Sequence, residues 1–356
     1  MKKLVSLLLA AAMMTTLMTG CSSSGSSSAP SGSGAGSSAA SSSAAEAPEA
    51  TVLKVDVANV TVEGSVQDQA CRKLVELLNE SGLFEATFYP NSQLGSAIDN
   101  YESIHAGDFL ITTGGGSDWG DVCGVPDMGC AMTPFLYDEL SDVYGLAESD
   151  LWKGMLAEAE TNGMKIFASP AMSGARYFMT NKEIHTPEDL AGVKLRVPTS
   201  SYYINAIEAF GGTPTAIPVN ELYTSLAQKM VDGCEFPYED AYGRQLYEVV
   251  EYASTTPYLI GFVFFGTSDD LWNAMNDEQK AVMEAAAAEA GAYSIEIFSE
   301  MEAKGKQQLE DAGMTFVDID VESFRACLDK FYELCGWDDA FVAELTKVME
   351  DYRASK

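Results

Sequence analysis

One arginine in this acidic chain stands in a position that could serve chemistry. Arg196 lies in the stretch "GVKLRVPTSS" (192–201), where apolar residues alternate with Lys194 and Arg196. This alternation predicts a strand with one apolar and one polar face, and Pro198 ends it. The chain contains only 6 arginines but 53 acidic residues. Arg196 therefore either pairs with an acid on a solvated face or points at a ligand.

No motif of an enzyme class accompanies this arginine. The chain has no G-x-S-x-G, H-E-x-x-H or P-loop sequence. Its two histidines, His105 and His185, belong to no paired acid–base motif, and we interpret both as surface residues. The carboxylate spacing in "DIDVE" (318–322) could suggest calcium, but the stretch lacks the glycine and the length of an EF-hand loop. Asp320 is better explained as a helix N-cap, so the sequence indicates neither an enzyme nor a metal site.

The composition limits the classes of partner. The chain has 356 residues, of which 47% are hydrophobic and 21% are charged, and this length allows two domains. Its formal net charge is −32. Such a surface repels nucleic acid and anionic lipid headgroups, so we expect no nucleic-acid partner. The net charge does not determine the charge inside a binding pocket.

The first fifty residues predict export. Two lysines precede the apolar run "LVSLLLAAAMM", which is too short to span a bilayer, and the segment ends at "LMTGC". Gly20 before Cys21 resembles a bacterial lipobox, so we expect a lipoprotein signal peptide over 1–20 and lipidation of Cys21. The alternative is a plain secretory signal followed by a chance cysteine. Residues 21–50 then form a Ser/Ala/Gly tether with a reach of roughly 30 Å.

Six further cysteines follow Cys21. They are Cys71, Cys123, Cys130, Cys234, Cys327 and Cys335. An exported chain could pair them in disulfides, yet a chain of this length can be stable without bridges. No C-x-x-C pair is present, which argues against zinc and thioredoxin-type chemistry. Their pairing stays open.

Strand and helix patterns alternate along the chain. Strands are expected at 51–60, 84–89, 108–113, "MKIFAS" (164–169) and "ARYFMTN" (175–181), with helices between them. This alternation predicts an α/β sheet, and the glycine run 114–116 follows a strand where cleft-lining loops occur. A helical pattern over 276–312 would span about 50 Å, which is enough to run along more than one domain.

Several motifs agree, in order, with one family. They are P-x-D-L-x-G-x-K-x-R-x-P (187–198), Gly-Gly-x-Pro-Thr (211–215), E-x-Y-x-x-L (221–226), V-D-G-x-E-x-P (231–237) and "YPNSQLGS" (89–96). The chain thereby resembles the DctP-type solute-binding proteins of TRAP (tripartite ATP-independent periplasmic) transporters. The resemblance covers about residues 51–350 and is most specific over 184–252.

The resemblance implies a fold and a function. It implies a two-domain α/β receptor of the periplasmic-binding-protein type, with a central cleft, hinge crossings and a long helix spanning both domains. Domain I would be 51–173 plus 262–301, and domain II would be 174–261 plus 302–356. The protein would be a non-enzymatic receptor without a cofactor, held on the outer face of the cytoplasmic membrane. It would pass a small carboxylate to membrane permease subunits. A receptor for an ATP-driven importer and a surface enzyme are the alternatives.

The family's pattern also implies site residues. Arg196, and Arg176 twenty residues before it, would hold the ligand's carboxylate from adjacent strands. Phe236 stands where the family often has an asparagine, which implies a site that favours keto, branched-chain or aromatic acids over sugar acids. Further lining candidates from cleft-facing segments are Asn59, Ser117, Asp118, Trp119, Val219 and Tyr238.

Overall fold

The first part of the chain folds as the alternation of strands and helices predicts. The computed structural model describes residues 52–356, all of which belong to one compact unit. Its first elements are β1 (Leu53–Ala58), α1 (Val66–Glu80), β2 (Phe84–Tyr89), α2 (Ala97–His105) and β3 (Leu110–Gly114). The three strands are parallel, in the order β2-β1-β3. Ser65 caps α1 by accepting a hydrogen bond from the backbone N–H of Asp68, at 3.3 Å.

A second group of parallel strands lies further along the chain. It contains β5 (Lys194–Val197), β6 (Thr213–Ala216) and β7 (Gly233–Phe236), with helices α6 (Ser201–Ala209), α7 (Leu222–Ala227) and α8 (Tyr238–Gly243). β5 lies between β7 and β6. A single 3₁₀ turn over Pro187–Leu190, with Thr186 as its N-cap, precedes β5.

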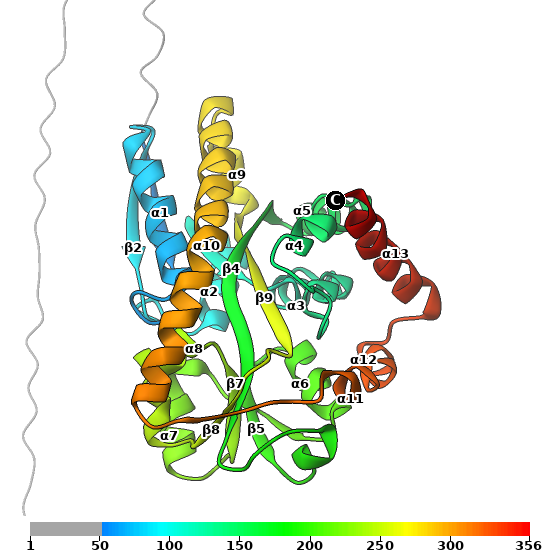
Figure 1. Ribbon diagram of the computed structural model, residues 1–356. Coiled ribbons are helices and arrows are strands. Elements are labelled where there is room, and N and C mark those ends of the chain that lie inside the picture. Colours follow the sequence, from blue (N-terminus) through cyan, green and yellow to red (C-terminus); the bar gives the residue numbers. More distant parts are fainter. Residues whose placement is uncertain (1–51) are drawn as a thin grey trace, which may run out of the picture. The chain divides into compact units, whose positions relative to one another are not determined.

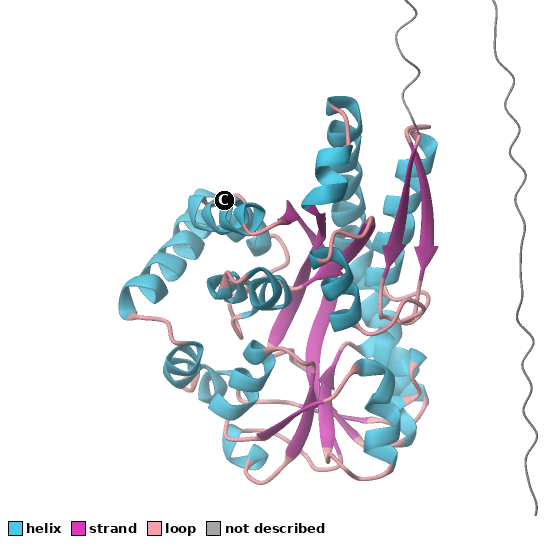
Figure 2. Cartoon of the chain, turned by 180° about the vertical axis from the view of Figure 1, so that it is seen from behind, coloured by secondary structure: helices cyan, strands magenta, loops and turns pink. Residues whose placement is uncertain are grey.

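Two long strands join the two groups. β9 (Leu259–Ser268) pairs with β3 and with β4 (Met164–Thr180), and the end of β4 pairs with β7 and with β8 (Tyr252–Ser254). Figure 1 shows β4 and β9 running side by side between the groups, and Figure 2 shows the strands from behind. β4 replaces the two strands expected from the sequence, because bulges between Ile166 and Pro170 and between Met172 and Gly174 let pairing with β9 continue. Gly174 has a φ of 109°, which favours glycine.

The helix predicted over 276–312 is α10 (Asp277–Asp311), which contacts α1, β4 and α8 and so runs along both strand groups. Two glycines permit its close approach. A Cβ at Gly291 would lie 2.4 Å from the Pro170 carbonyl oxygen, and one at Gly305 would lie 2.6 Å from the Glu239 backbone nitrogen. The Ser294 hydroxyl accepts a hydrogen bond from the Met172 N–H at 2.8 Å, which fixes α10 to β4 beside its second bulge.

The remaining elements complete the two groups. They are α3 (Gly116–Cys123), a 3₁₀ helix (Pro126–Met132), α4 (Asp142–Ala147), α5 (Asp150–Thr161), α9 (Asp269–Ala274), β10 (Thr315–Val317), α11 (Val321–Arg325), α12 (Leu328–Cys335) and α13 (Asp339–Ser355), with 3₁₀ turns at Val219–Glu221 and Leu246–Glu248. Asp320 caps α11, as expected. α13 packs on α4, and Arg353 contacts Asp142 at 2.9 Å. The bounds of the two domains stay a prediction.

Three further predictions concern the export segment, the cysteines and the membrane. The signal peptide (1–20), Cys21 and the tether (21–50) lie outside the described residues. The six downstream cysteines are free thiols in the structure. Within residues 52–356, no helix combines the length and the apolar character needed to cross a membrane.

Candidate ligand-binding cavity

Residues from both strand groups line one cavity of about 300 Å³. Ligands of open α/β sheets bind beyond the carboxyl ends of parallel strands. The cavity follows this rule on both sides, since Thr61 follows β1, Gly114 ends β3, Thr199 follows β5, and Val219 follows β6. The volume suits a small organic molecule.

Arg196 is a buried cation without a protein counter-ion of its own. Its side chain lines the cavity, and the residue is 2% exposed. The Nε atom donates to the Ile217 carbonyl at 2.7 Å, whereas Nη1 makes no hydrogen bond within residues 52–356. Burial lowers the pKa of Arg196 to about 10, so the guanidinium still carries its charge at neutral pH. A buried charge of this kind is stabilised only when an anion pairs with it.

Arg176 also lines the cavity, but it is already paired. Its Nη2 donates to Glu235 Oε1 at 2.8 Å and to the Glu235 carbonyl at 3.1 Å, and its Nε contacts Oε2. The Tyr258 hydroxyl donates to the same carboxylate at 2.9 Å. The two arginines do not come from adjacent strands as expected, because β7, which carries Glu235, lies between β4 and β5. Arg196 therefore provides the positive charge that has no ion-pair partner, whereas Arg176 lines the same cavity with its charge already paired to Glu235.

The ring of Phe236 lies among three guanidinium groups. The carbon Cζ lies 5.6 Å from the ring centroid for Arg176 and 5.8 Å for both Arg196 and Arg244. Such distances are typical of cation–π contacts. Phe236 lines the cavity as predicted for its position, but much of its ring serves to pack the arginines.

A second ion pair lies beside the cavity, and its two residues also form hydrogen bonds that join the two strand groups. Arg244 Nε lies 3.2 Å from Asp240 Oδ1, and both residues belong to the α8 region. Arg244 Nη2 donates to the Val60 carbonyl at 2.9 Å, and Asp240 accepts from the Val62 N–H at 3.2 Å. These bonds hold the segment after β1 against α8. They also neutralise Arg244 and Asp240 within the protein.

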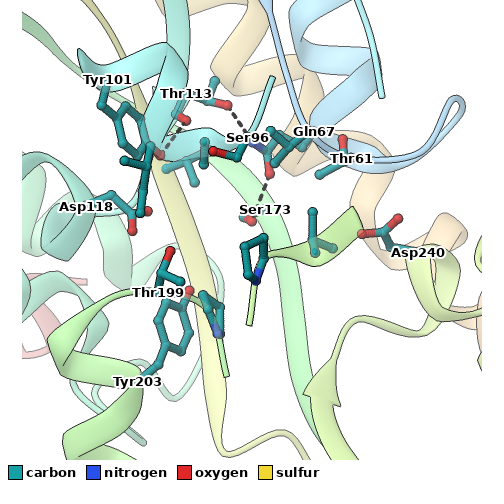
Figure 3. Close-up of a pocket in the computed structure, with 18 of the residues that line it drawn as sticks. Thr61, Gln67, Ser96, Tyr101, Thr113, Asp118, Ser173, Thr199, Tyr203 and Asp240 are labelled. Carbon is teal, nitrogen blue, oxygen red and sulfur yellow. Dashed lines mark hydrogen bonds between the residues drawn. The ribbon is translucent and has the colours of Figure 1, made fainter. Parts of the chain in front are cut away.

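The wall on the side of α3 is polar. Asp118 lines the cavity and accepts a hydrogen bond from the Gly115 N–H at 2.9 Å. Burial raises the pKa of Asp118 to about 6. Figure 3 shows Asp118 near Tyr203 and Thr199, while Gln67 reaches between Thr113 and Ser173. The Ser173 hydroxyl donates to Gln67 at 3.1 Å. The cavity therefore offers several hydrogen-bonding groups opposite the arginines.

The structure brings some of the predicted residues together and not others. Those that line the cavity are Arg176, Arg196, Phe236, Asp118 and Val219. Those that do not are Asn59, Ser117, Trp119 and Tyr238, all of which are buried elsewhere.

Their contacts explain why these four residues face away. The Trp119 indole is 0% exposed and donates to the Phe264 carbonyl at 3.0 Å. The Tyr238 ring stacks on Tyr177 with centroids 3.6 Å apart. Asn59 accepts a hydrogen bond from the Asn91 N–H at 3.3 Å. Ser117 is buried inside the same helix that presents Asp118.

Sequence reasoning missed several polar lining residues, namely Gln67, Tyr101, Thr113, Asp121, Ser173, Thr199, Tyr203, Asn220 and Asp240. Thr113 ends a predicted strand before the glycine run, which is a signal that could have found it. Ser173 lies at a bulge that only the pairing of β4 reveals. Both histidines are exposed, as expected. Within residues 52–356, no group of three or more His, Cys, Asp or Glu side chains could hold a metal ion.

The crossing strands, the spanning helix and a cavity closed by both strand groups define a two-domain solute receptor, and comparison with known proteins names its family. A family model described as bacterial extracellular solute-binding protein, family 7 (DctP) matches residues 57–335, so the chain belongs to that family. The predicted family and fold class are thereby confirmed. Members of the family are substrate-binding receptors and not enzymes, and this protein is such a receptor.

Named relatives agree with this assignment. A solute-binding protein of Roseobacter denitrificans is 28% identical over 252 residues, which cover 69% of this chain and 74% of that protein. The sialic acid-binding periplasmic protein SiaP of Vibrio cholerae is 25% identical over 288 residues, which cover 80% of this chain and 88% of that protein.

Solved structures agree as well. A TRAP periplasmic solute-binding protein from Ochrobacterium anthropi, with bound L-fuconate, is 27% identical with a TM-score of 0.79, covering 84% of this chain and 99% of that chain. One from Actinobacillus succinogenes, with bound L-galactonate, is 25% identical with the same TM-score and the same coverage.

Proposed function

We propose that this protein captures a small organic carboxylate outside the cytoplasm and delivers it to a TRAP-type secondary transporter. The observation that carries the proposal is Arg196, a buried cation whose Nη1 lacks a partner within the described residues and which lines the cavity. A carboxylate placed there would accept charge-assisted hydrogen bonds from the guanidinium and would pair its charge. Relatives with bound acids, such as L-fuconate and L-galactonate, support this ligand class.

A thermal-shift screen of the purified protein against organic acids tests this function. A bound ligand stabilises the folded state by RT ln(1 + [L]/Kd), so an acid present at 100 times its Kd adds about 2.7 kcal/mol. We expect at least one monocarboxylic acid to raise the melting temperature clearly. Galactitol serves as the matched control for L-galactonate, because it has the hydroxyl groups but no carboxylate. Equal shifts for the two compounds, or no shift with any acid, would contradict the proposal.

We further propose that the mature protein is anchored to the outer face of the cytoplasmic membrane through a lipid on Cys21. The support is the sequence "LMTGC" and the Ser/Ala/Gly tether over 21–50, both of which lie outside the described residues. A tether of this composition, with an expected reach of roughly 30 Å, would keep the receptor close to the transporter.

Replacing Cys21 with alanine is expected to release the protein from the membrane fraction or to leave it uncleaved. Cell fractionation and the mass of the mature N-terminus provide the measurement. Ser22→Ala, which changes the neighbouring residue of the tether, is the matched control and should stay in the membrane fraction. An unchanged distribution of the Cys21→Ala protein would refute the anchor and leave the receptor function untouched.

A further inference from the structure

Some of the charged residues that line the cavity have an ion-pair partner within the protein, and others do not. Arg176 pairs with Glu235, and Asp240 pairs with Arg244. Arg196 remains as an unpaired cation on the side of β5. On the side of α3, Asp118 and Asp121 line the same cavity and form no salt bridge within residues 52–356. The cavity therefore has one positive pole and one negative pole.

The negative pole is held in place by its own helix. Asp118 lies in the first turn of α3, where the Gly115 N–H fixes Oδ2, and the carboxylate points toward Thr199 and Tyr203 in Figure 3. Asp121 accepts hydrogen bonds from the Ser201 hydroxyl at 3.2 and 3.4 Å. Asp118 has no such partner from the second strand group. Its carboxylate is therefore the one that is available to a ligand.

The aromatic residues expected from the sequence do not surround this pole, where Tyr101 and Tyr203 line the cavity instead. Trp119 and Tyr238 lie in the core, and the ring of Phe236 packs against three arginines. Of the three aromatic residues expected to favour apolar acids, only Phe236 lines the cavity. An ionised carboxylate only accepts hydrogen bonds, so any contact that the partly buried Asp118 adds to its bond from the Gly115 N–H requires a donor group on the ligand.

Building on the proposed carboxylate receptor, we propose that Asp118 determines which acids bind. It accepts hydrogen bonds from hydroxyl groups at the far end of the ligand, and it repels a second carboxylate. A hydroxylated monocarboxylate satisfies both poles, since its carboxylate meets Arg196 and its hydroxyl groups meet Asp118. A dicarboxylate leaves two like charges facing each other at close range, which is strongly unfavourable. An aliphatic keto acid would displace water from the partly buried Asp118 carboxylate and supply no donor in return.

Titration calorimetry with four acids tests the role of Asp118. The probes are L-galactonate, D-galacturonate, succinate and 3-methyl-2-oxobutanoate. The wild type is expected to bind at least one of the two hydroxylated acids and to bind succinate at least a hundredfold more weakly. Asp118→Asn should bind the hydroxylated acid about fivefold more weakly, because hydrogen bonds to a charged acceptor are roughly twice as strong as those to a neutral one. The same variant should bind succinate at least tenfold more tightly, because the repulsion is lost.

Matched variants separate this role from a structural one. Asp127→Asn removes the same charge at an exposed position near α3 that does not line the cavity, and its four affinities should equal those of the wild type. A merely structural Asp118 would weaken all acids by one factor and leave their ratio unchanged, and that result overturns the inference. So does tighter wild-type binding of succinate or 3-methyl-2-oxobutanoate than of both hydroxylated acids. If either of these two results is found and Arg196→Ala abolishes the binding, the inference about Asp118 fails but the proposed carboxylate-receptor function stands. If the wild type binds no acid at all, the inference about Asp118 and the proposed function both fail.

Discussion

Replacing Arg196 with alanine is expected to weaken carboxylate binding by roughly tenfold to thousandfold. A hydrogen bond to a charged group contributes on the order of 1.5–3 kcal/mol, and 1.4 kcal/mol corresponds to a factor of ten in affinity. Arg196 contributes the unpaired Nη1 and a charge that no residue within 52–356 neutralises by an ion pair. Arg196→Lys should recover only part of the loss, because an ammonium group cannot donate two parallel hydrogen bonds. Calorimetry with the acid that gives the largest thermal shift measures both variants.

Removing the charge of Arg196 should act in the opposite direction on the stability of the ligand-free protein. A buried cation without a counter-ion is unfavourable, so Arg196→Met should melt at the same temperature as the wild type or higher when no acid is present. Lys194→Ala provides the matched control, because Lys194 is an exposed cation on the same strand. Binding by Arg196→Ala within twofold of the wild type, in a folded protein, would show that Arg196 does not hold the ligand.

Local patterns predicted most of the elements. The strand expected at 84–89 is β2, and the helix expected at 276–312 is α10 (Asp277–Asp311), because hydrophobic periodicity and helix caps act over neighbouring residues. The continuity of β4 could not be predicted in this way. It depends on pairing with β9, which lies almost one hundred residues further along the chain, and on bulges that interrupt the local pattern.

Site residues could be predicted where a sequence motif identifies them. The direction in which a side chain points could not be predicted, because it depends on packing in the folded protein. The motifs identified Arg196 and Arg176, but they gave no counter-ion for Arg176. That role belongs to Glu235, which is brought there by the register of β4 with β7. Asp118 and Trp119 are neighbours in α3, yet side chains on a helix diverge by about 100° per residue. One side chain therefore faces the cavity while the next enters the core.

Glu239 occupies an unusual place between the spanning helix and the bulge of β4. Both of its carboxylate oxygens are buried and accept no hydrogen bond from the described residues. A Cβ at Gly174 would lie 3.2 Å from its Oε1, and Gly305 of α10 packs against its backbone. Burial, with added repulsion from Asp240 and Glu302, raises the pKa of Glu239 from 4.5 to about 8. The folded protein therefore keeps this carboxyl protonated at neutral pH.

This proton makes the free energy of unfolding depend on pH. Between pH 4.5 and pH 8, the unfolded chain releases the proton of Glu239 while the folded protein retains it. Stability is lost as the pH rises whenever the folded state binds more protons than the unfolded state, by about 1.4 kcal/mol per pH unit for one group. Glu239 alone should thus remove on the order of 5 kcal/mol of stability across this window, a loss that is complete above pH 8.

Glu239→Gln is expected to abolish this loss, because an amide does not ionise. Other buried acids titrate in the same range, among them Asp118, so the informative quantity is the difference in unfolding free energy between the variant and the wild type. That difference should grow in favour of the variant by a few kcal/mol as the pH rises from 4.5 to 8, measured by chemical denaturation at each pH. Glu300→Gln, an exposed position of α10, should show a constant difference near zero. A flat difference for Glu239→Gln would mean that its carboxylate is ionised in the folded protein and that its burial is relieved by bound water or by motion of α10.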